Sequence, residues 1–209
     1  ISACAGGSSR RVVASGWAGI AADDETAYLA YNTHVYAINL ANGTERWRYP
    51  SEPDPAVTFY SSPALTEDGQ LIIGGYNHTI YSLDPVNGQL NWTFEDSEGR
   101  FISDPLVTEN GIYTPSTDTH LYALDFKGKP LWREPYATEK EIWAQPASDP
   151  NCDCIYLASM DHNVYAIDSQ SGSLIWVTED LGGAIVGAPA ISEEDGVFVG
   201  TFAEELVAL

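Results

Sequence analysis

The sequence predicts an all-β fold in which four-stranded antiparallel units repeat along the chain, and three observations predict it. First, aligning the chain on Ile20, Pro63, Pro105, Pro146 and Pro189 gives steps of 43, 42, 41 and 43 residues. Second, every step repeats the same order of short apolar runs and polar turns, without a helical period. Third, 18 glycines and 12 prolines are spread among these runs, as in a chain with many turns.

Each unit is expected to contain four strands. A short first strand is followed by an acidic or Gly-containing turn and an apolar second strand, as in SSPALT (61–66) and LIIGGY (71–76). A third and a fourth strand follow, joined by a Gly-containing turn, as in VYAIDSQSGSLIW (164–176). Units of this length and content are typical of β-propeller blades. The predicted divisions are an N-terminal segment (1–16), four complete repeats (17–59, 60–101, 102–142 and 143–185) and a partial fifth (186–209).

The third strand is largely apolar on both faces, which suits a strand that lies between two neighbouring sheets. A small residue stands at its centre, and the glycine that follows supplies the positive φ that a tight hairpin needs. A tryptophan follows this glycine by four residues in every copy, where a large flat side chain can hold one sheet against the next. These structural positions are Gly43 and Trp47, Gly88 and Trp92, Gly128 and Trp132, and Gly172 and Trp176.

This pattern resembles that of a known family. The residues Ala166-x-Asp168-x-x-Ser171-Gly172-x-x-x-Trp176 are similar to the tryptophan-docking motif of the pyrroloquinoline-quinone-type (PQQ-like) β-propeller repeats. The resemblance spans residues 17–209, and the nearest type is the propeller lipoprotein of the outer-membrane barrel-assembly machinery. The other copies match with Asn39 in place of Asp, with Ser82 in place of Ala, and with one residue fewer in the turn before Trp132.

The resemblance implies a fold more specifically than a function, because this repeat serves both enzymes and binding scaffolds. Quinone dehydrogenases of the family use a bound quinone, a calcium ion, an aspartate base and often a disulfide between adjacent cysteines. Here Cys152 and Cys154 are not adjacent, and no acidic cluster has the spacing of a calcium loop. We therefore expect no catalytic residue, no cofactor and no metal. The favoured function is a non-enzymatic scaffold for protein–protein interaction, and the alternatives are a quinone-dependent oxidoreductase and an extracellular ligand-sensing domain.

The charge of the chain limits its partners. Thirty acidic and nine basic side chains give a net charge of −21. Such a surface repels the phosphates of nucleic acid and the headgroups of anionic lipids. The favoured interpretation is a well-solvated acidic surface, and the alternatives are solubility in a saline medium and attraction to basic partners. We therefore expect no nucleic acid, and contact with a membrane only through an N-terminal lipid, while the resemblance implies a protein partner.

The N-terminal residues predict that lipid. Ile1-Ser2-Ala3 fill the three places before Cys4, as at the cleavage site of a bacterial lipoprotein signal, and a Gly/Ser stretch follows as a flexible tether. No basic start or apolar region precedes Ile1 in this sequence, so either that part was removed or the match is fortuitous. The pattern predicts a lipid anchor at Cys4 and an extracytoplasmic, membrane-anchored protein, either periplasmic or at the cell surface.

Three further sets of residues invite a functional interpretation. Cys152 and Cys154 could form a disulfide in an oxidising compartment, although an extended segment holds their Cα atoms near the upper limit for a bridge and a kink after Pro150 would be needed. Four histidines recur in one turn of successive repeats, where they are turn residues or contacts of a pH-sensitive rim. Three sequons permit glycosylation, although asparagine is common in turns. The histidines are His34, His78, His120 and His162, and the sequon asparagines are Asn42, Asn77 and Asn91.

The fifth repeat stops at Leu209, before its expected Gly turn and tryptophan. Two explanations follow from the pattern. In the first, the chain is part of a longer protein whose ring has roughly seven or eight blades. In the second, the ring closes at five blades and residues 9–15 supply the missing outer strand. The first is favoured, because residues 9–15 contain neither a Gly turn nor a tryptophan in the docking position.

Overall fold

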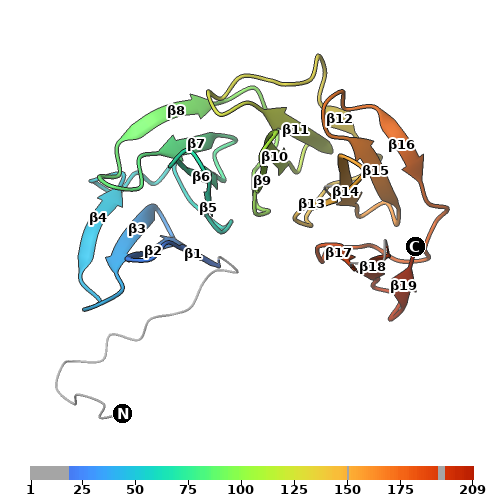
Figure 1. Ribbon diagram of the computed structural model, residues 1–209, viewed down its shortest axis with the longest axis horizontal. Coiled ribbons are helices and arrows are strands. Elements are labelled where there is room, and N and C mark those ends of the chain that lie inside the picture. The colour runs from blue at the N-terminus through green and yellow to red at the C-terminus, as the bar shows by residue number, and fades with distance from the viewer. Residues whose placement is uncertain (1–18, 150, 193–195) are drawn as a thin grey trace, which may run out of the picture.

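The computed structural model describes residues 19–149, 151–192 and 196–209, which form five antiparallel sheets. The sheets follow one another in chain order around an open arc (Figure 1). We call them blades 1 to 5. The predicted all-β fold with four-stranded blades is confirmed, and blade 5 has three strands among the described residues.

The strands of each blade are hydrogen-bonded in sequence order, so each blade is an antiparallel meander. Blade 1 contains β1 (Ile20–Ala22), β2 (Thr26–Tyr31), β3 (His34–Asn39) and β4 (Glu45–Tyr49). Blade 2 contains β5 (Ala64–Leu65), β6 (Leu71–Gly74), β7 (Ile80–Leu83) and β8 (Leu90–Phe94). Blade 3 contains β9 (Leu106–Thr108), β10 (Gly111–Pro115), β11 (His120–Leu124) and β12 (Tyr136–Ala137). Blade 4 contains β13 (Ala147–Asp149), β14 (Cys154–Ala158), β15 (Val164–Asp168) and β16 (Leu174–Val177), and blade 5 contains β17 (Ala190–Ile191), β18 (Val197–Gly200) and β19 (Leu206–Ala208).

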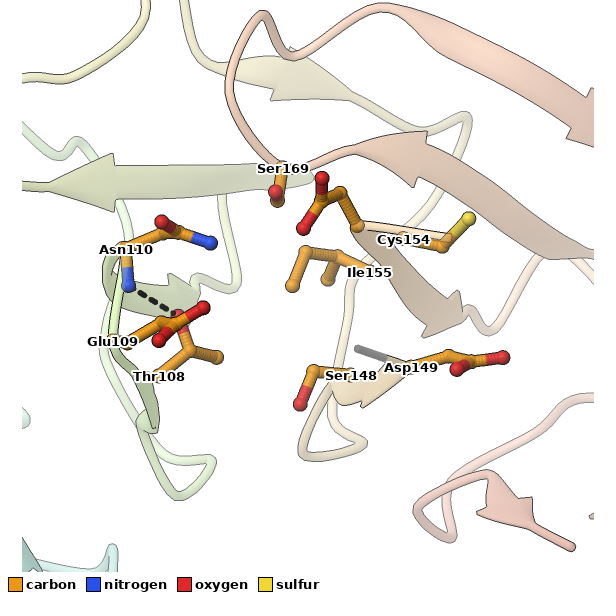
Figure 2. Close-up of a pocket in the computed structure, with 9 residues that line it drawn as sticks. Thr108, Glu109, Asn110, Ser148, Asp149, Cys154, Ile155 and Ser169 are labelled. Atoms are coloured by element: carbon orange, nitrogen blue, oxygen red, sulfur yellow. Dashed lines mark hydrogen bonds between the residues drawn. The ribbon is translucent and has the colours of Figure 1, made fainter. Parts of the chain in front are cut away.

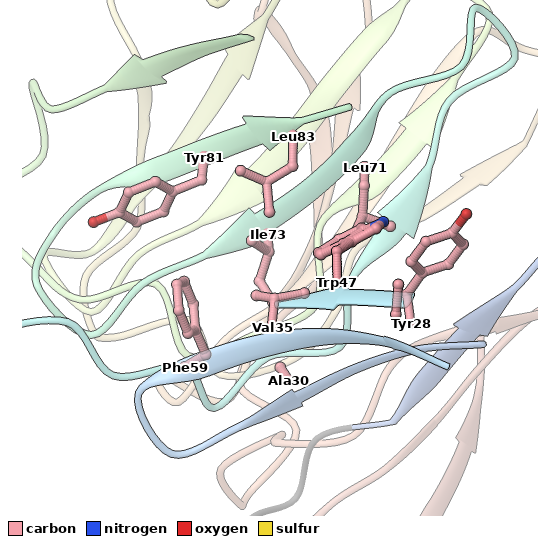
Figure 3. Packing of buried hydrophobic residues seen from close by; sticks show 10 residues of the cluster. Tyr28, Ala30, Val35, Trp47, Phe59, Leu71, Ile73, Tyr81 and Leu83 are labelled. Atoms are coloured by element: carbon pink, nitrogen blue, oxygen red, sulfur yellow. The ribbon is translucent and has the colours of Figure 1, made fainter. Parts of the chain in front are cut away.

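The core lies between the blades. Figure 3 shows the first of these interfaces, in which Tyr28, Val35 and Trp47 of blade 1 pack against Leu71 and Leu83 of blade 2. Similar clusters lie between every later pair of neighbouring blades. Burying a side chain of this size contributes about 1.5–3 kcal/mol. A blade therefore depends on its neighbours for most of its apolar burial, as the repeat pattern indicates.

The turn between the third and fourth strands is longer than the tight hairpin that the sequence suggested. In blade 1 the amide of Asn39 bonds to the carbonyl of Thr44, and the amide of Gly43 bonds back to the carbonyl of Asn39. Only the glycine has a positive φ, of 71°, and a register shift follows Ala37 in the strand. Blades 2 and 4 repeat the register shift. The glycine therefore closes a four-residue loop, in which its left-handed conformation is still required.

Blade 3 departs from the predicted pattern. Its fourth strand was expected to end at Trp132, but residues 131–135 are not a strand and β12 contains only Tyr136 and Ala137. Pro130 and Pro135 explain the difference, because a proline has no amide hydrogen to donate to the neighbouring strand. A single bridge between Leu124 and Pro130 is all that remains of the expected pairing before β12.

No helix within the described part of the chain is both long and apolar enough to cross a membrane.

Candidate functional site

In blades 1 to 3, the tryptophan that follows the Gly turn contacts the Gly turn of the next blade. The indole nitrogen of Trp47 donates a hydrogen bond of 2.9 Å to the carbonyl of Pro85. Its ring lies over Gly88, where a Cβ atom would be only 2.6 Å from Cε3 of the ring. The glycine is therefore required twice, once for its φ of 72° and once for the close approach of the indole.

We call the interface between two neighbouring blades a seam. The next two seams repeat this geometry. Trp92 donates to the carbonyl of Phe126 at 3.1 Å, and Trp132 donates to the carbonyl of Ser169 at 2.9 Å. A Cβ atom on the glycine of the next blade would approach the indole ring to 2.5 Å in one seam and 2.6 Å in the other. These glycines are Gly128 and Gly172. Trp132 keeps its contact although it lies outside a strand.

A second donor to the same carbonyl was not predicted from the sequence. The hydroxyl of Tyr28 donates to the carbonyl of Pro85 at 3.2 Å, and that of Tyr113 donates to the carbonyl of Ser169 at 3.1 Å. Both tyrosines lie opposite the small residue of the neighbouring strand, Ala37 or Ala123. This cross-strand pairing of a tyrosine with an alanine is the sequence signal that could have identified them.

Blade 2 has an isoleucine, Ile72, at the position of these tyrosines, and Gln70 supplies the second donor instead. Its side-chain amide donates to the carbonyl of Phe126 at 2.9 Å. Its oxygen accepts hydrogen bonds from Ser82 at 2.6 Å and from Trp92 at 3.0 Å. Ser82 therefore replaces alanine in this copy of the motif because its hydroxyl holds the glutamine.

The first glycine and the last tryptophan of the series have different surroundings. No heavy atom of the described residues lies within 4 Å of the Cβ position of Gly43. Trp176 is half-buried, packs beside Tyr156 with ring centroids 5.7 Å apart, and contacts the cluster that contains Val197 of blade 5. The segment 9–15, considered above as a closing strand, lies outside the described residues.

The turn between the second and third strands carries a repeated hydrogen bond to a tyrosine hydroxyl. In blade 3, Tyr122 donates to Asp118 at 2.7 Å. The same carboxylate oxygen accepts from the hydroxyl of Ser97 at 2.7 Å and from the amides of Glu98 and Gly99 at 3.0 and 3.2 Å. Asp118 therefore holds the connection between blades 2 and 3 against its own turn.

These contacts determine the acidity of both groups. Burial raises the pKa of Asp118, but the hydrogen bonds from Tyr122 and Ser97 outweigh it, so the pKa lies below its ordinary value. Burial and the bond to the carboxylate raise the pKa of Tyr122. Blade 4 repeats the arrangement with Asp161 and Tyr165 at 2.7 Å, and burial and this bond likewise raise the pKa of Tyr165.

The four histidines lie at or beside this same turn, and three of them contact different groups. Nδ1 of His34 lies 3.0 Å from the hydroxyl of Thr33, and Nδ1 of His120 lies 2.8 Å from the carbonyl of Asp118. Nδ1 of His162 lies 2.9 Å from Asp180, and His78 is exposed with a φ of 69°. Within residues 19–149, 151–192 and 196–209, no three His, Cys, Asp or Glu residues form a group that could hold a metal ion. A role for these histidines in contacting a partner stays a prediction.

Cys152 and Cys154 are joined by a disulfide in the structure, with their Cα atoms 5.1 Å apart. The separation is shorter than the extended segment considered above would give, because Asp153 takes a φ of 53° and turns the chain. The carbonyl of Asp153 also accepts the amide of Ser169 at 2.9 Å. The residue between the cysteines thus joins two turns of blade 4.

The sequon asparagines have different environments. Asn42 is exposed, and its side-chain oxygen accepts the amide and the hydroxyl of Thr44 at 3.0 and 2.7 Å. Asn77 donates to the hydroxyl of Tyr81 at 2.7 Å, and Asn91 donates to Ser82 at 3.2 Å. Of these three asparagines, only Asn42 could carry a glycan without loss of the hydrogen bonds that Asn77 and Asn91 donate within blade 2. Cys4, the predicted lipid anchor, lies outside the described residues.

Comparisons with known proteins place this geometry in a family. A family model described as "Outer membrane protein assembly factor BamB" matches residues 31–209. The serine/threonine-protein kinase AfsK of Streptomyces griseus is 26% identical over 73% of this chain and 23% of that protein. The outer membrane protein assembly factor BamB of Yersinia pestis is 24% identical over 72% of this chain and 39% of that protein.

Solved structures show the same fold. The crystal structure of BamB from Moraxella catarrhalis superposes with a TM-score of 0.74 and 18% identity, over 91% of this chain and 56% of that one. The computationally designed Ika8 protein gives a TM-score of 0.76 at 14% identity, over 90% of this chain and 56% of that one. The chain spans less than half the length of the curated relatives that it matches. Because the family model matches most of the chain, the protein belongs to the family of PQQ-like β-propeller repeats that this model describes as outer membrane protein assembly factor BamB.

Proposed function

We propose that this protein is a non-enzymatic, extracytoplasmic scaffold that binds protein partners through the turns at the rims of its blades. The observation that carries the proposal is the series of three seams in which an indole and a second side chain donate to one carbonyl of the next blade. Such seams hold successive blades in a fixed relation, so the turns of different blades form one surface. A preformed surface of this kind loses little conformational entropy on binding.

The charge of the chain supports a basic partner. A net charge of −21 attracts surfaces of opposite sign and raises the rate of encounter with them. The name of two curated relatives, outer membrane protein assembly factor, supports a role beside other proteins at a membrane. The Ile1-Ser2-Ala3-Cys4 pattern supports attachment of this chain to that membrane by a lipid on Cys4.

Capture from native membranes tests the protein-binding role. The tagged full-length protein is expressed in its source organism, and partners are recovered at low and at high salt. We expect a defined set of proteins that is depleted at high salt, because screening weakens attraction between exposed charges. The intact mass of the native N-terminal peptide tests the anchor, and an unmodified Cys4 in protein purified from membranes would refute it.

A second candidate, a ligand-sensing domain, is favoured by one observation. The match to the kinase AfsK covers only 23% of that protein, so the repeat forms one part of a larger protein there. A titration with small ligands, including a quinone with calcium, separates this candidate from the scaffold. Saturable, ligand-dependent changes in absorbance or fluorescence at micromolar concentration would favour sensing or quinone chemistry over protein binding.

A further inference from the structure

The seam between blades 3 and 4 contains a cleft that the docking contacts do not fill. Its volume is about 260 Å³. The β9–β10 turn lines one side with Glu109 and Asn110, and blade 4 lines the other with Ser148 and Ser169 (Figure 2). Asp153 of blade 4 also lines the cleft. The cleft opens on the rim that carries the turns after the first and the third strands of each blade.

One substitution between repeats explains why the cleft lies at this seam. The carbonyl of Ser169 accepts a hydrogen bond from the tryptophan of the preceding blade, as the carbonyl of Phe126 does in the seam between blades 2 and 3. Ser169 therefore has a small hydroxyl where the equivalent residue has a phenyl ring. The strand β10 begins with Gly111. The equivalent position in blade 2, judged by strand pairing, is Gln70, whose side chain reaches across the seam between blades 2 and 3. A Cβ atom on Gly111 would lie 2.5 Å from Cδ1 of Leu131, so the space at this glycine is already filled, and the change at Ser169 is the one that opens the cleft.

The cleft contains a polar group without a partner. The Ser169 side chain is buried, with 4% of the residue exposed; it lies near the Tyr113 hydroxyl, but its hydroxyl oxygen forms no hydrogen bond of normal length and angle among the described residues. Figure 2 shows this side chain directed into the space between Asn110 and Ile155. A buried hydroxyl without a partner is uncommon, because leaving it unpaired costs about 1–3 kcal/mol. A ligand that brings a hydrogen-bond donor would remove this cost.

The charge of the lining specifies the ligand. Three carboxylates, those of Glu109, Asp149 and Asp153, line the cleft, and no lysine, arginine or histidine is among the described residues around it. Asp149 accepts the amide of Asn151 at 2.9 Å, which leaves Glu109 and Asp153 as the exposed carboxylates of the rim. The buried side chain of Ile155 adds an apolar surface against which an aliphatic stem can lie.

The disulfide contributes by holding Asp153. This residue stands between the two bonded cysteines, and its carbonyl accepts the amide of Ser169. Its backbone is thus held at both sides, which lowers the conformational entropy that this residue loses when a ligand binds. The Cys-Asp-Cys sequence, which matched no catalytic pattern, thereby acquires a positioning role.

We propose that this cleft binds the side chain of a lysine or arginine on the protein partner, with its cationic group between the Glu109 and Asp153 carboxylates and the Ser169 hydroxyl. The inference rests on the proposed protein-binding function and names the chemistry that the partner must offer. A metal ion fits less well, because no group of three metal-binding side chains lies close enough together in the described residues. A cationic group on an aliphatic stem matches the carboxylates, the hydroxyl and the apolar wall together.

The test uses the full-length native protein and a capped tripeptide, acetyl-Gly-Lys-Gly-amide, followed by the backbone amide signals of the cleft in NMR. The arginine tripeptide and the Nε-acetyl-lysine tripeptide are titrated in parallel. We expect saturable shifts at Asn110, Ser148 and Ser169 with the cationic peptides and none with the acetylated one. The Ser169→Phe variant, which copies Phe126, should abolish these shifts while the rest of the spectrum stays folded.

Two charge-matched variants complete the design. Asp153→Asn removes one rim carboxylate and keeps a residue that tolerates positive φ, and it should weaken the peptide Kd about tenfold. Asp24→Asn removes one exposed charge from a turn of blade 1 and should leave the Kd unchanged. Equal shifts across the acidic surface, or an unchanged Kd in both Asp153→Asn and Ser169→Phe, would overturn the inference. A saturable response to calcium chloride alone at these amides would also overturn it, in favour of a metal site.

Membrane capture separates this inference from the function on which it rests. If wild-type protein captures partners and Ser169→Phe captures them equally, the cleft is not the contact and the scaffold function stands. If the tripeptide binds as expected but no partner is captured, the cleft chemistry stands and the scaffold function fails.

Discussion

At the scale of the residue, one carbonyl per seam receives two donors from the preceding blade. The carbonyl of Ser169 accepts both Trp132 and Tyr113, at 2.9 and 3.1 Å. All three groups lie in the interior, where a hydrogen bond is expensive to leave unmade. The indole thus contributes through its polar end as well as through its buried ring.

Replacing Trp132 with phenylalanine removes the donor and part of the ring. We expect the free energy of unfolding to fall by about 1–3 kcal/mol, measured by urea unfolding. Trp143→Phe is the matched control, because Trp143 is 38% exposed and donates only to the exposed Glu141. An equal loss in the two variants would show that the seam bond adds nothing.

The glycine under each indole gives a second test with a control in the same chain. Gly128→Ala places a Cβ 2.5 Å from the Trp92 ring, whereas Gly43→Ala meets no described atom within 4 Å. Both glycines have a φ above 70°, so both variants carry the same backbone cost of about 1–2 kcal/mol. Overpacking should add about 1–3 kcal/mol in Gly128→Ala alone. Thermal unfolding of the two variants measures the difference, and similar midpoints would argue against the close approach.

At the scale of the element, the turn after the second strand joins neighbouring blades through a carboxylate. The pKa of Asp118 is lowered in the folded protein. Its contacts therefore stabilise the fold at pH values above the ordinary pKa of 3.8. This contribution is lost as the pH falls through the lower, folded pKa. The corresponding residue of blade 2, Asn77, donates to its tyrosine instead of accepting from it.

Asp118→Asn should therefore destabilise the protein at neutral pH, because an amide NH₂ group would face the donors of Ser97, Glu98 and Gly99. The difference in unfolding free energy between wild type and variant should be constant from pH 7 to near pH 4 and should shrink below 3.8. Urea unfolding at a series of pH values measures it. A difference that does not change with pH would mean that ionisation of Asp118 does not contribute.

The Cys152–Cys154 disulfide also belongs to this scale, because it closes the turn between β13 and β14. We expect both cysteines of protein purified without reductant to resist alkylation in the unfolded state, and to react fully after reduction. Mass spectrometry of the peptide that contains Asp153 gives the result. Complete labelling of both cysteines before reduction would show free thiols.

The sequence predicted the elements better than the contacts between them. The 41- to 43-residue period and the recurring Gly and Trp predicted the blades, because each repeat must present the same faces to its neighbours. The missing strand before β12 was not predicted, although Pro130 and Pro135 were visible. The role of Gln70 could not be read from the sequence, because it depends on which side chain crosses a seam between distant segments. The aligned motif sets Phe126 against Ser169, but the cleft could not be predicted from it, because the sequence does not show which segments of the two blades face this position.

At the scale of the whole molecule, five blades follow an open arc and share a strongly negative charge (Figure 1). The fold alone is compatible with several functions, because PQQ-like repeats are also part of a protein named as a kinase. The acidic composition and the fixed relation between successive blades favour protein binding. Partner capture is expected to weaken as ionic strength rises from about 0.05 to 0.5 M, because the Debye length shortens.

Crosslinking in native membranes, followed by mass-spectrometric mapping of the joined residues, tests the scaffold function most directly. We expect crosslinks from the rim turns, including the turn at Glu109 and the segment of Ser148 and Asp153, to lysine-rich peptides of one or a few partner proteins. Crosslinkers that carry no charge, used as a control, should join the same pairs of sites. An absence of partner crosslinks, together with a saturable quinone- and calcium-dependent absorbance of the purified protein, would contradict the scaffold function.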